Sequence, residues 1–163
     1  QYKRSVRRVV TAARELATGL RKRMNEIAKK LGASSANFVE PSGLSEKNVI
    51  SAKDYAIMAR EALKEKVIKD ASATAKYSFT LKNSNKKKFT FYNSSSIVRY
   101  ASWNVTGSKT GYLNEAGYCL FTRVKTGADQ LIVVTMNHRT RELSFLETTE
   151  LVRYGWRLID PAK

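Results

Sequence analysis

The sequence has 163 residues and a mass of 18.4 kDa, a length typical of one compact domain or of a compact domain with a helical arm. With 42% hydrophobic and 10% aromatic residues it has enough apolar material for a core, which excludes a wholly disordered chain. Lysine and arginine total 30 against 14 acidic residues, and the formal net charge of +16 favours anionic partners. No apolar run approaches the roughly 18 residues that span a bilayer.

Single copies of cysteine and histidine limit the metal and redox chemistry of the chain. Cys119 alone excludes an internal disulfide and a cysteine-based zinc site, and His138 alone excludes histidine-rich metal sites. We therefore predict neither a metal ion nor another cofactor. Cys119 is expected to be buried in an apolar strand, and His138 to have a surface or structural role. The chain begins with Gln1, which indicates a processed, truncated or engineered sequence.

Apolar residues recur at spacings of three and four over the first thirty residues, which predicts an amphipathic helix with a basic opposite face. Gly19 allows a break into two helices, and Gly32 stands where a helix C-cap favours glycine. Such a helix either packs on the core with a solvated basic back, or binds a polyanion or a membrane surface. We assign residues 1–31 to a basic helical segment and residues 32–163 to an α+β region, together forming one compact domain.

Two more helical regions are predicted. After a loop over residues 33–50, Ser51 and Asp54 have the spacing of a capping box at the start of a helix. A closing helix is expected over residues 141–154, with Gly155 ending it.

Between these helices apolar residues recur at every second position, as in a strand. Residues 76–81 and 89–91 predict a hairpin with its aromatic side chains on one face, around a polar turn at residues 83–86. Residues 118–124 and 130–136 predict a second hairpin. Helices, then strands, then a helix indicate an α+β fold, in which flanking helices cover an antiparallel sheet.

The tripeptide formed by Lys109, Thr110 and Gly111 carries the most chemical information. Lys-Thr-Gly alone is weak evidence, because three common residues often meet by chance. Its context strengthens it, because it precedes Tyr112 and leads directly into the predicted strand pair.

In this context the sequence resembles the serine-type D-Ala-D-Ala carboxypeptidases of peptidase family S11, which are low-molecular-mass penicillin-binding proteins. The resemblance runs in order from about residue 24 to residue 156. It implies the C-terminal part of the catalytic domain, with a partial penicillin-binding-protein/β-lactamase-like fold, in the bacterial cell envelope outside the cytoplasm. The matching stretches besides Lys-Thr-Gly are residues 24–32, 38–44, 51–54, 93–97, 141–142 and 154–155.

The resemblance also implies roles for individual residues. The Lys109 ammonium and the Thr110 hydroxyl would bind the terminal carboxylate of a peptidoglycan stem peptide, or that of a β-lactam. Gly111 would leave room for the peptide beside the strand backbone. The backbone N–H of Tyr112 would supply half of an oxyanion hole, or Tyr112 is an ordinary strand aromatic. The expected catalytic residues are therefore Lys109 and Tyr112, and the expected substrate-binding residues are Lys109, Thr110 and Gly111.

The family's other two motifs, Ser-x-x-Lys and Ser-x-Asn, are missing where the resemblance places them. Ser84 begins a Ser-x-x-Lys by letters, but in a predicted hairpin turn, and Ser35 and Ser102 begin Ser-x-Asn in loops with other roles. Residues 8–10 read Arg-Val-Val where Ser-x-Asn is expected. An acyl-enzyme mechanism needs an activated nucleophile, so we expect this chain alone to be inactive in trimming peptidoglycan peptides. The half that carries the serine would be another chain, a removed segment or a lost piece.

Two other interpretations stay open at this point. The chain could be a catalytically inactive cationic module that binds an anionic polymer, such as cell wall, lipid or nucleic acid, with binding that weakens as salt rises. No nucleic-acid motif supports the last of these. It could also be an engineered rearrangement of the carboxypeptidase scaffold.

Overall fold

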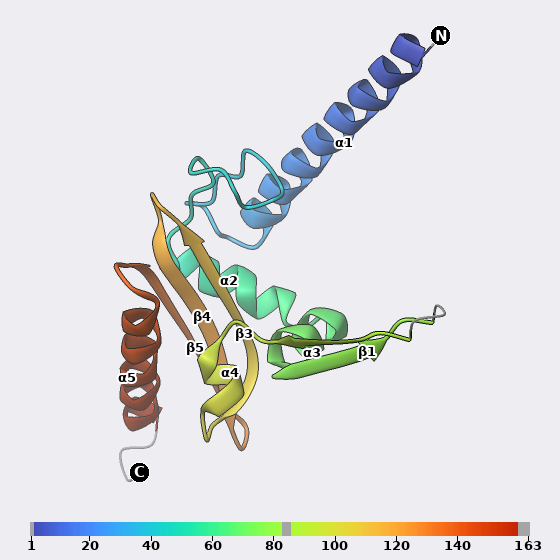
Figure 1. The fold of residues 1–163 in the computed structure, drawn as a ribbon. Helices are drawn as coiled ribbons and strands as arrows, with labels where there is room; N and C mark the ends of the chain where they lie inside the picture. Colours follow the sequence, from blue (N-terminus) through green and yellow to red (C-terminus); the bar gives the residue numbers. More distant parts are fainter. Residues whose placement is uncertain (1, 83–85, 160–163) are drawn as a thin grey trace. The chain divides into compact units, whose positions relative to one another are not determined.

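The computed structural model describes residues 2–82 and 86–159, which form two compact units, Gln1–Met58 and Ala59–Lys163 (Figure 1). We describe each unit by itself. Across the described residues, no helix combines the length and the apolar content that crossing a bilayer requires. The elements in chain order are α1 Tyr2–Lys30, α2 Ala52–Ala62, α3 Lys66–Ala73, β1 Lys76–Thr80, β2 Lys88–Tyr92, α4 Ser96–Tyr100, β3 Asn104–Leu113, β4 Gly117–Thr126, β5 Asp129–His138 and α5 Arg141–Ile159.

Helix α1 runs unbroken through Gly19, so the allowed break into two helices is wrong. The C-cap is confirmed, because Gly32 has a φ of +84° and two capping hydrogen bonds close the helix end. The N–H of Ala33 donates to the carbonyl of Ala28 at 2.9 Å, and the N–H of Gly32 donates to that of Lys29 at 3.1 Å. This is the Schellman pattern, which needs a left-handed residue at its centre. The assignment of residues 1–31 and 32–163 to separate regions stays a prediction.

The predicted capping box at α2 forms only in part. The N–H of Asp54 donates to Ser51 Oγ at 3.2 Å, as expected of an N-cap serine. The Asp54 carboxylate does not return to Ser51; it accepts the hydroxyl of Ser35 at 2.6 Å and the N–H of Ser35 at 2.7 Å. These bonds lower the pKa of Asp54, the Ser35 hydroxyl most of all. Ser35 therefore joins the preceding loop to α2, which confirms that its Ser-x-Asn letters serve another role.

A second carboxylate organises the loop over residues 33–50. Glu40 accepts the N–H groups of Leu44 at 2.9 Å and Ser45 at 3.1 Å, and the side-chain amide of Asn48 at 2.6 Å. It also accepts the N–H of Ser42 at 2.5 Å. Hydrogen bonding with Ser42, followed by the bonds from Ser45 and Asn48, lowers the pKa of Glu40 from 4.5 to about 2.

In the second unit, strands β3, β4 and β5 form an antiparallel sheet in that order, with α5 packed on β4 and β5 (Figure 1). Central strand β4 is the most buried of the three. The core forms where α5 meets the sheet, because apolar residues of both turn toward one another. The buried cluster is Val124, Val133 and Val152, with Trp103, Val105, Leu131 and Trp156 packed around it. The expected α+β fold is confirmed.

Gly155 does not end the closing helix, and that prediction is wrong. Helix α5 continues to Ile159, and Gly155 is buried inside it. A Cβ at Gly155 would lie 2.5 Å from Cδ2 of Leu131 on β5. The glycine therefore allows close approach of helix and strand, which outweighs its low helix propensity.

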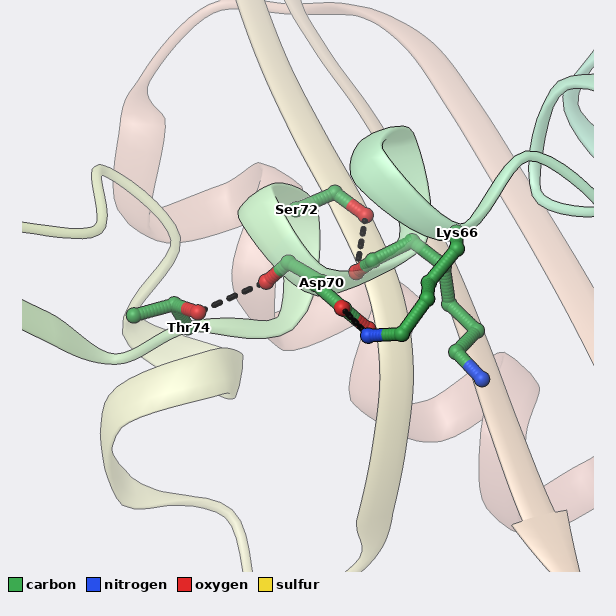
Figure 2. A network of polar contacts seen from close by, with 5 residues as sticks. Lys66, Asp70, Ser72 and Thr74 are labelled. Carbon is green, nitrogen blue, oxygen red and sulfur yellow. Dashed lines mark hydrogen bonds and ion pairs between the residues drawn. The ribbon is translucent and has the colours of Figure 1, made fainter.

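Strands β1 and β2 form the predicted first hairpin as a separate two-stranded sheet. The Ser84 motif and most of the expected turn lie outside the described residues. Helix α3 precedes the hairpin, and polar contacts hold its end (Figure 2). Thr74 Oγ1 donates to the Asp70 carbonyl at 2.6 Å, while the Asp70 carboxylate pairs with Lys66.

The single cysteine and the single histidine lie near the same sheet end. Cys119 is only half-buried, contrary to expectation, because the β4–β5 pairing has a bulge between Tyr118 and Leu120. His138 is buried, with Nδ1 3.6 Å from Oε2 of Glu147. That position is structural and not on the surface.

Candidate functional site

The Lys-Thr-Gly tripeptide lies on β3, at the edge of the three-stranded sheet. Among the described strands, β3 pairs only with β4. In this pairing Lys109 lies opposite Phe121, Thr110 opposite Leu120 and Gly111 opposite Cys119. Lys109 and Gly111 are exposed and Thr110 is half-buried. An edge strand leaves backbone N–H and C=O groups available for another extended chain.

The residues just before the tripeptide fix β3 in place. Ser108 is buried, and its hydroxyl donates to the carbonyl of Phe121 on β4 at 2.9 Å. A Cβ at Gly107 would lie 2.6 Å from Cδ2 of Leu63, so glycine allows this close packing. One side of β3 is therefore held rigidly, while the tripeptide lies at the surface.

Thr110 belongs to a polar network that joins three elements of the fold. Its Oγ1 lies 2.7 Å from Oγ of Ser94, which precedes α4. The guanidinium of Arg141, the first residue of α5, donates to the carbonyl of Ser94. A cation and two hydroxyl groups thus meet beside the edge strand, a combination suited to binding a carboxylate.

Asn93 holds the loop that presents Ser94. Its side-chain amide donates to the carbonyls of Ser72 at 3.2 Å and Thr74 at 3.1 Å, while its Oδ1 accepts the N–H of Ser95 at 2.9 Å. Ser95 is fully buried. The backbone on either side of Ser94 is therefore fixed, and its hydroxyl is kept facing Thr110.

The positions of Lys109 and Gly111 leave space at this edge. The Lys109 ammonium donates to the carbonyl of Thr110, so the cation stays next to the Thr110 backbone. A Cβ built on Gly111 would meet no atom within 4 Å. Packing within the chain does not explain this glycine, whereas an approaching ligand backbone would.

Tyr112 has well-defined side-chain partners of its own. Its hydroxyl donates to Oδ1 of Asn114 at 2.8 Å, and its ring centroid lies 4.4 Å from that of Tyr118. These contacts agree with the second interpretation of Tyr112, in which its side chain is an ordinary aromatic residue of a strand. They do not involve its backbone N–H, the group that the resemblance assigns to an oxyanion hole.

The arrangement suits an anion, and the described residues form no serine–lysine pair of the kind that activates a nucleophile. Within them, no hydrogen bond joins a serine hydroxyl to a lysine ammonium, and no three histidine, cysteine, aspartate or glutamate side chains gather as a metal site would need. Ser102 precedes Trp103, whose carbonyl accepts the N–H of Val105 at 2.9 Å at the start of β3. Among the described residues, Lys109, Thr110 and Gly111 thus lie at the edge of the sheet without a hydrogen-bonded serine–lysine pair beside them.

Sequence reasoning did not assign a role to Ser94 or Arg141. Both lie in stretches that resemble the family, so a signal was present for their positions. Their contacts could not be inferred, because Arg141 and Ser94 are 47 residues apart and Ser94 and Thr110 are 16 apart.

Comparison with known proteins identifies the family. Residues 17–140 match the D-alanyl-D-alanine carboxypeptidase family, peptidase S11. The chain is 35% identical over 136 residues to D-alanyl-D-alanine carboxypeptidase DacF of Bacillus subtilis, covering 83% of this chain and 34% of that protein. It is 32% identical over 130 residues to a D-alanyl-D-alanine endopeptidase of Escherichia coli, covering 80% of this chain and 42% of that protein. The chain thus spans well under half the length of these relatives.

Solved structures show the same fold. A variant of the Streptomyces K15 DD-transpeptidase matches with a TM-score of 0.76 and 22% identity, over 86% of this chain and 55% of that one. A D-alanyl-D-alanine carboxypeptidase from Mycobacterium tuberculosis matches with a TM-score of 0.69 and 24% identity, over 83% of this chain and 52% of that one. The alternative of an inactive cationic module receives no support from these comparisons. The chain belongs to the D-alanyl-D-alanine carboxypeptidase family, peptidase S11.

Proposed function

We propose that this chain forms the carboxylate-binding side of a D-Ala-D-Ala carboxypeptidase site that trims peptidoglycan stem peptides in the bacterial cell envelope. The observation that carries the proposal is the network of Thr110, Ser94 and Arg141 beside the free edge of β3. Family membership supplies the substrate class, a peptide ending in D-Ala-D-Ala, and β-lactams as its mimics.

In this proposal the substrate lies along the edge of β3. The Thr110 hydroxyl donates to the terminal carboxylate, and the Lys109 ammonium moves from the Thr110 carbonyl to neutralise its charge. Gly111 admits the substrate backbone, because no side chain occupies that space. The backbone N–H of Tyr112 stabilises the oxyanion that develops at the scissile carbonyl.

The nucleophile comes from a segment that carries Ser-x-x-Lys, which these 163 residues lack outside Ser84. The serine Oγ would attack the penultimate D-Ala carbonyl, form an ester and release the terminal D-Ala. Water would then hydrolyse the ester and regenerate the serine. Lys109, Thr110, Gly111 and Tyr112 position and polarise the substrate in both steps.

Two measurements on the 163-residue chain test whether it binds the substrate and lacks the nucleophile. Intact mass before and after incubation with benzylpenicillin should be unchanged, since the chain has no activated serine; an adduct would show a nucleophile within it. Amide shifts on titration with diacetyl-Lys-D-Ala-D-Ala should move at residues 109–112, and should move less with the L-Ala-L-Ala peptide. Equal shifts for both peptides, or shifts confined to other residues, would overturn the proposal.

A further inference from the structure

The hairpin of β1 and β2 exposes a cluster of aromatic rings. Tyr77 pairs with Phe91 and Phe79 pairs with Phe89, which places the four side chains on one face. Tyr77, Phe91 and Phe79 are 61%, 57% and 40% exposed. We call these four residues the aromatic face. In Figure 1 the hairpin extends away from the three-stranded sheet.

The opposite face of the hairpin is mainly polar, with Lys76, Lys88 and the exposed Tyr92 beside a serine–threonine pair. Ser78 and Thr90 lie across from one another there, with their hydroxyl oxygens 2.8 Å apart. None of the four rings belongs to the buried core cluster of the second unit. A hairpin with one aromatic and one mainly polar face, neither packed on that core, is typical of a binding surface.

The hairpin is also strongly basic. Residues 76–93 contain no aspartate or glutamate, and none of their lysines forms an ion pair within the described part of the chain. The Lys87 ammonium lies 5.2 Å from the ring centroid of Phe89, and that of Lys76 lies 5.6 Å from the ring centroid of Tyr92. The lysines therefore favour an anionic occupant for this surface, and the rings favour an apolar one. The lysines are Lys76, Lys82, Lys86, Lys87 and Lys88.

The ring geometry selects among anionic partners. Phe79 stacks on Phe89 with centroids 5.6 Å apart and planes inclined by 22°, and on Phe91 with 6.0 Å and 13°. At these separations the nearly parallel rings lie side by side with a lateral offset, so together they form a continuous apolar surface and do not present one isolated ring to a base. Proteins that bind single-stranded nucleic acid stack successive bases on individual aromatic rings. A lipid interface needs only a continuous apolar surface.

Asp70, an acidic residue at the base of the hairpin, is paired with a lysine. A cavity of about 520 Å³ lies between α3 and the hairpin, lined by Asp70, Tyr77, Phe91 and others. The Asp70 carboxylate pairs with the Lys66 ammonium, as Figure 2 shows, and this bond lowers the pKa of Asp70. Its charge therefore does not oppose an anionic surface next to the rings.

We propose that the aromatic face binds the surface of an anionic phospholipid bilayer. The four rings enter the interface between headgroups and acyl chains, where aromatic side chains are stable. Lys87, whose ammonium lies over Phe89, extends that group to the lipid phosphates with its methylene stem along the ring. The other lysines of the hairpin add electrostatic attraction to the anionic surface. This contact is independent of the Lys-Thr-Gly edge of β3, so it holds whether or not the proposed peptidase function does.

Vesicle binding by the 163-residue chain tests the electrostatic part. Sedimentation with vesicles of phosphatidylcholine and phosphatidylglycerol at 3:1 should show binding that phosphatidylcholine alone does not. Replacing Lys82, Lys87 and Lys88 with glutamine should weaken it about fivefold per lysine, or about 100-fold in total. Three matched replacements outside the hairpin, Lys29→Gln, Lys30→Gln and Lys47→Gln, should weaken it much less. An equal loss in both triple variants would overturn the proposal.

Ring insertion has its own readout. In the Phe91→Trp variant, bound to these vesicles, tryptophan emission should shift to the blue and brominated lipid should quench it, beyond the background of Trp103 and Trp156. The double change Phe79→Ser with Phe91→Ser should abolish the binding that survives 0.5 M salt, while Phe91→Leu should retain it. Circular dichroism confirms that each variant is folded. An unshifted emission, or tighter hairpin-dependent binding to an oligo-dT strand than to the vesicles, would overturn the proposal.

Discussion

The hydroxyl groups of Ser94 and Thr110 lie 2.7 Å apart, although 16 residues separate them in the chain. Ser94 is held from the other side by Arg141, whose guanidinium donates to its carbonyl. Because a hydroxyl can rotate to donate or accept, Thr110 can exchange this contact for a carboxylate without moving the backbone. This exchange links the geometry of the site to the proposed carboxypeptidase role.

Replacing Thr110 with valine should weaken binding of the D-Ala-D-Ala peptide about 10- to 100-fold, because a hydrogen bond to a charged group contributes about 1.5–3 kcal/mol. The dissociation constant follows from the amide-shift titration. Thr90→Val is a matched control, since Thr90 forms a similar exposed serine–threonine hydroxyl pair on the hairpin. Equal weakening in both variants would contradict a specific role for Thr110.

Replacing Gly111 with leucine should leave the fold intact and abolish peptide binding. A Cβ at Gly111 meets no atom within 4 Å, so the side chain enters only the space that the substrate needs. Thermal unfolding and the titration measure the two effects separately. A large loss of stability would show that Gly111 has a structural role, and retained binding would place the substrate elsewhere.

Gly155→Val and Gly19→Ala should change stability in opposite directions. A Cβ at Gly155 would lie 2.5 Å from Leu131, so the valine overpacks the helix–strand contact and costs about 1–3 kcal/mol. Gly19 lies in an exposed part of α1 with no atom within 4 Å of such a Cβ, and alanine should stabilise that helix by about 1 kcal/mol. Urea unfolding followed by circular dichroism measures both changes. Equal effects would contradict the close packing at Gly155.

The loop around Glu40 should lose stability in acid. The folded pKa of about 2 lies below the ordinary value of 4.5, so the ionised carboxylate stabilises the folded loop above pH 4.5. That contribution declines as the pH falls from 4.5 to about 2, where Glu40 becomes protonated in the folded state as well. The urea midpoint of the wild-type chain should therefore fall over this range.

Glutamine variants isolate the contribution of Glu40. In Glu40→Gln the unfolding midpoint should be lower at pH 7 and should fall less between pH 4.5 and 2 than in the wild type. Glu46→Gln alters an exposed neighbour outside this hydrogen-bond network and should follow the wild-type curve. Parallel curves for Glu40→Gln and the wild type would refute the assignment.

The sequence pattern predicted secondary structure correctly where neighbouring residues decide it, as in the first hairpin and at the end of α1. The alternation of Tyr77, Phe79, Phe89 and Phe91 predicted a hairpin and its aromatic face, because strand geometry sends alternate side chains to the same side. Gly32 predicted the end of α1, because a left-handed C-cap depends on one residue's backbone freedom. The ordered motifs around Lys109 also predicted the family, which the comparisons confirm.

Other features depended on contacts between distant parts of the chain. The Asp54 carboxylate accepts a hydrogen bond from Ser35 and not from Ser51, its expected partner. Helix α5 continues through Gly155, where Leu131 packs closely against the helix. The partner of Asp54 and the length of α5 both depend on contacts with residues distant in the sequence. Local propensity contributes too little free energy to override such tertiary packing. By itself the sequence determined the long first helix, α2, the closing helix, the two hairpins, the family and the Lys-Thr-Gly tripeptide, but not α4. Only the tertiary structure brought Ser94 and Arg141 to Thr110, because residues 16 and 47 positions apart meet only when the sheet and helices pack.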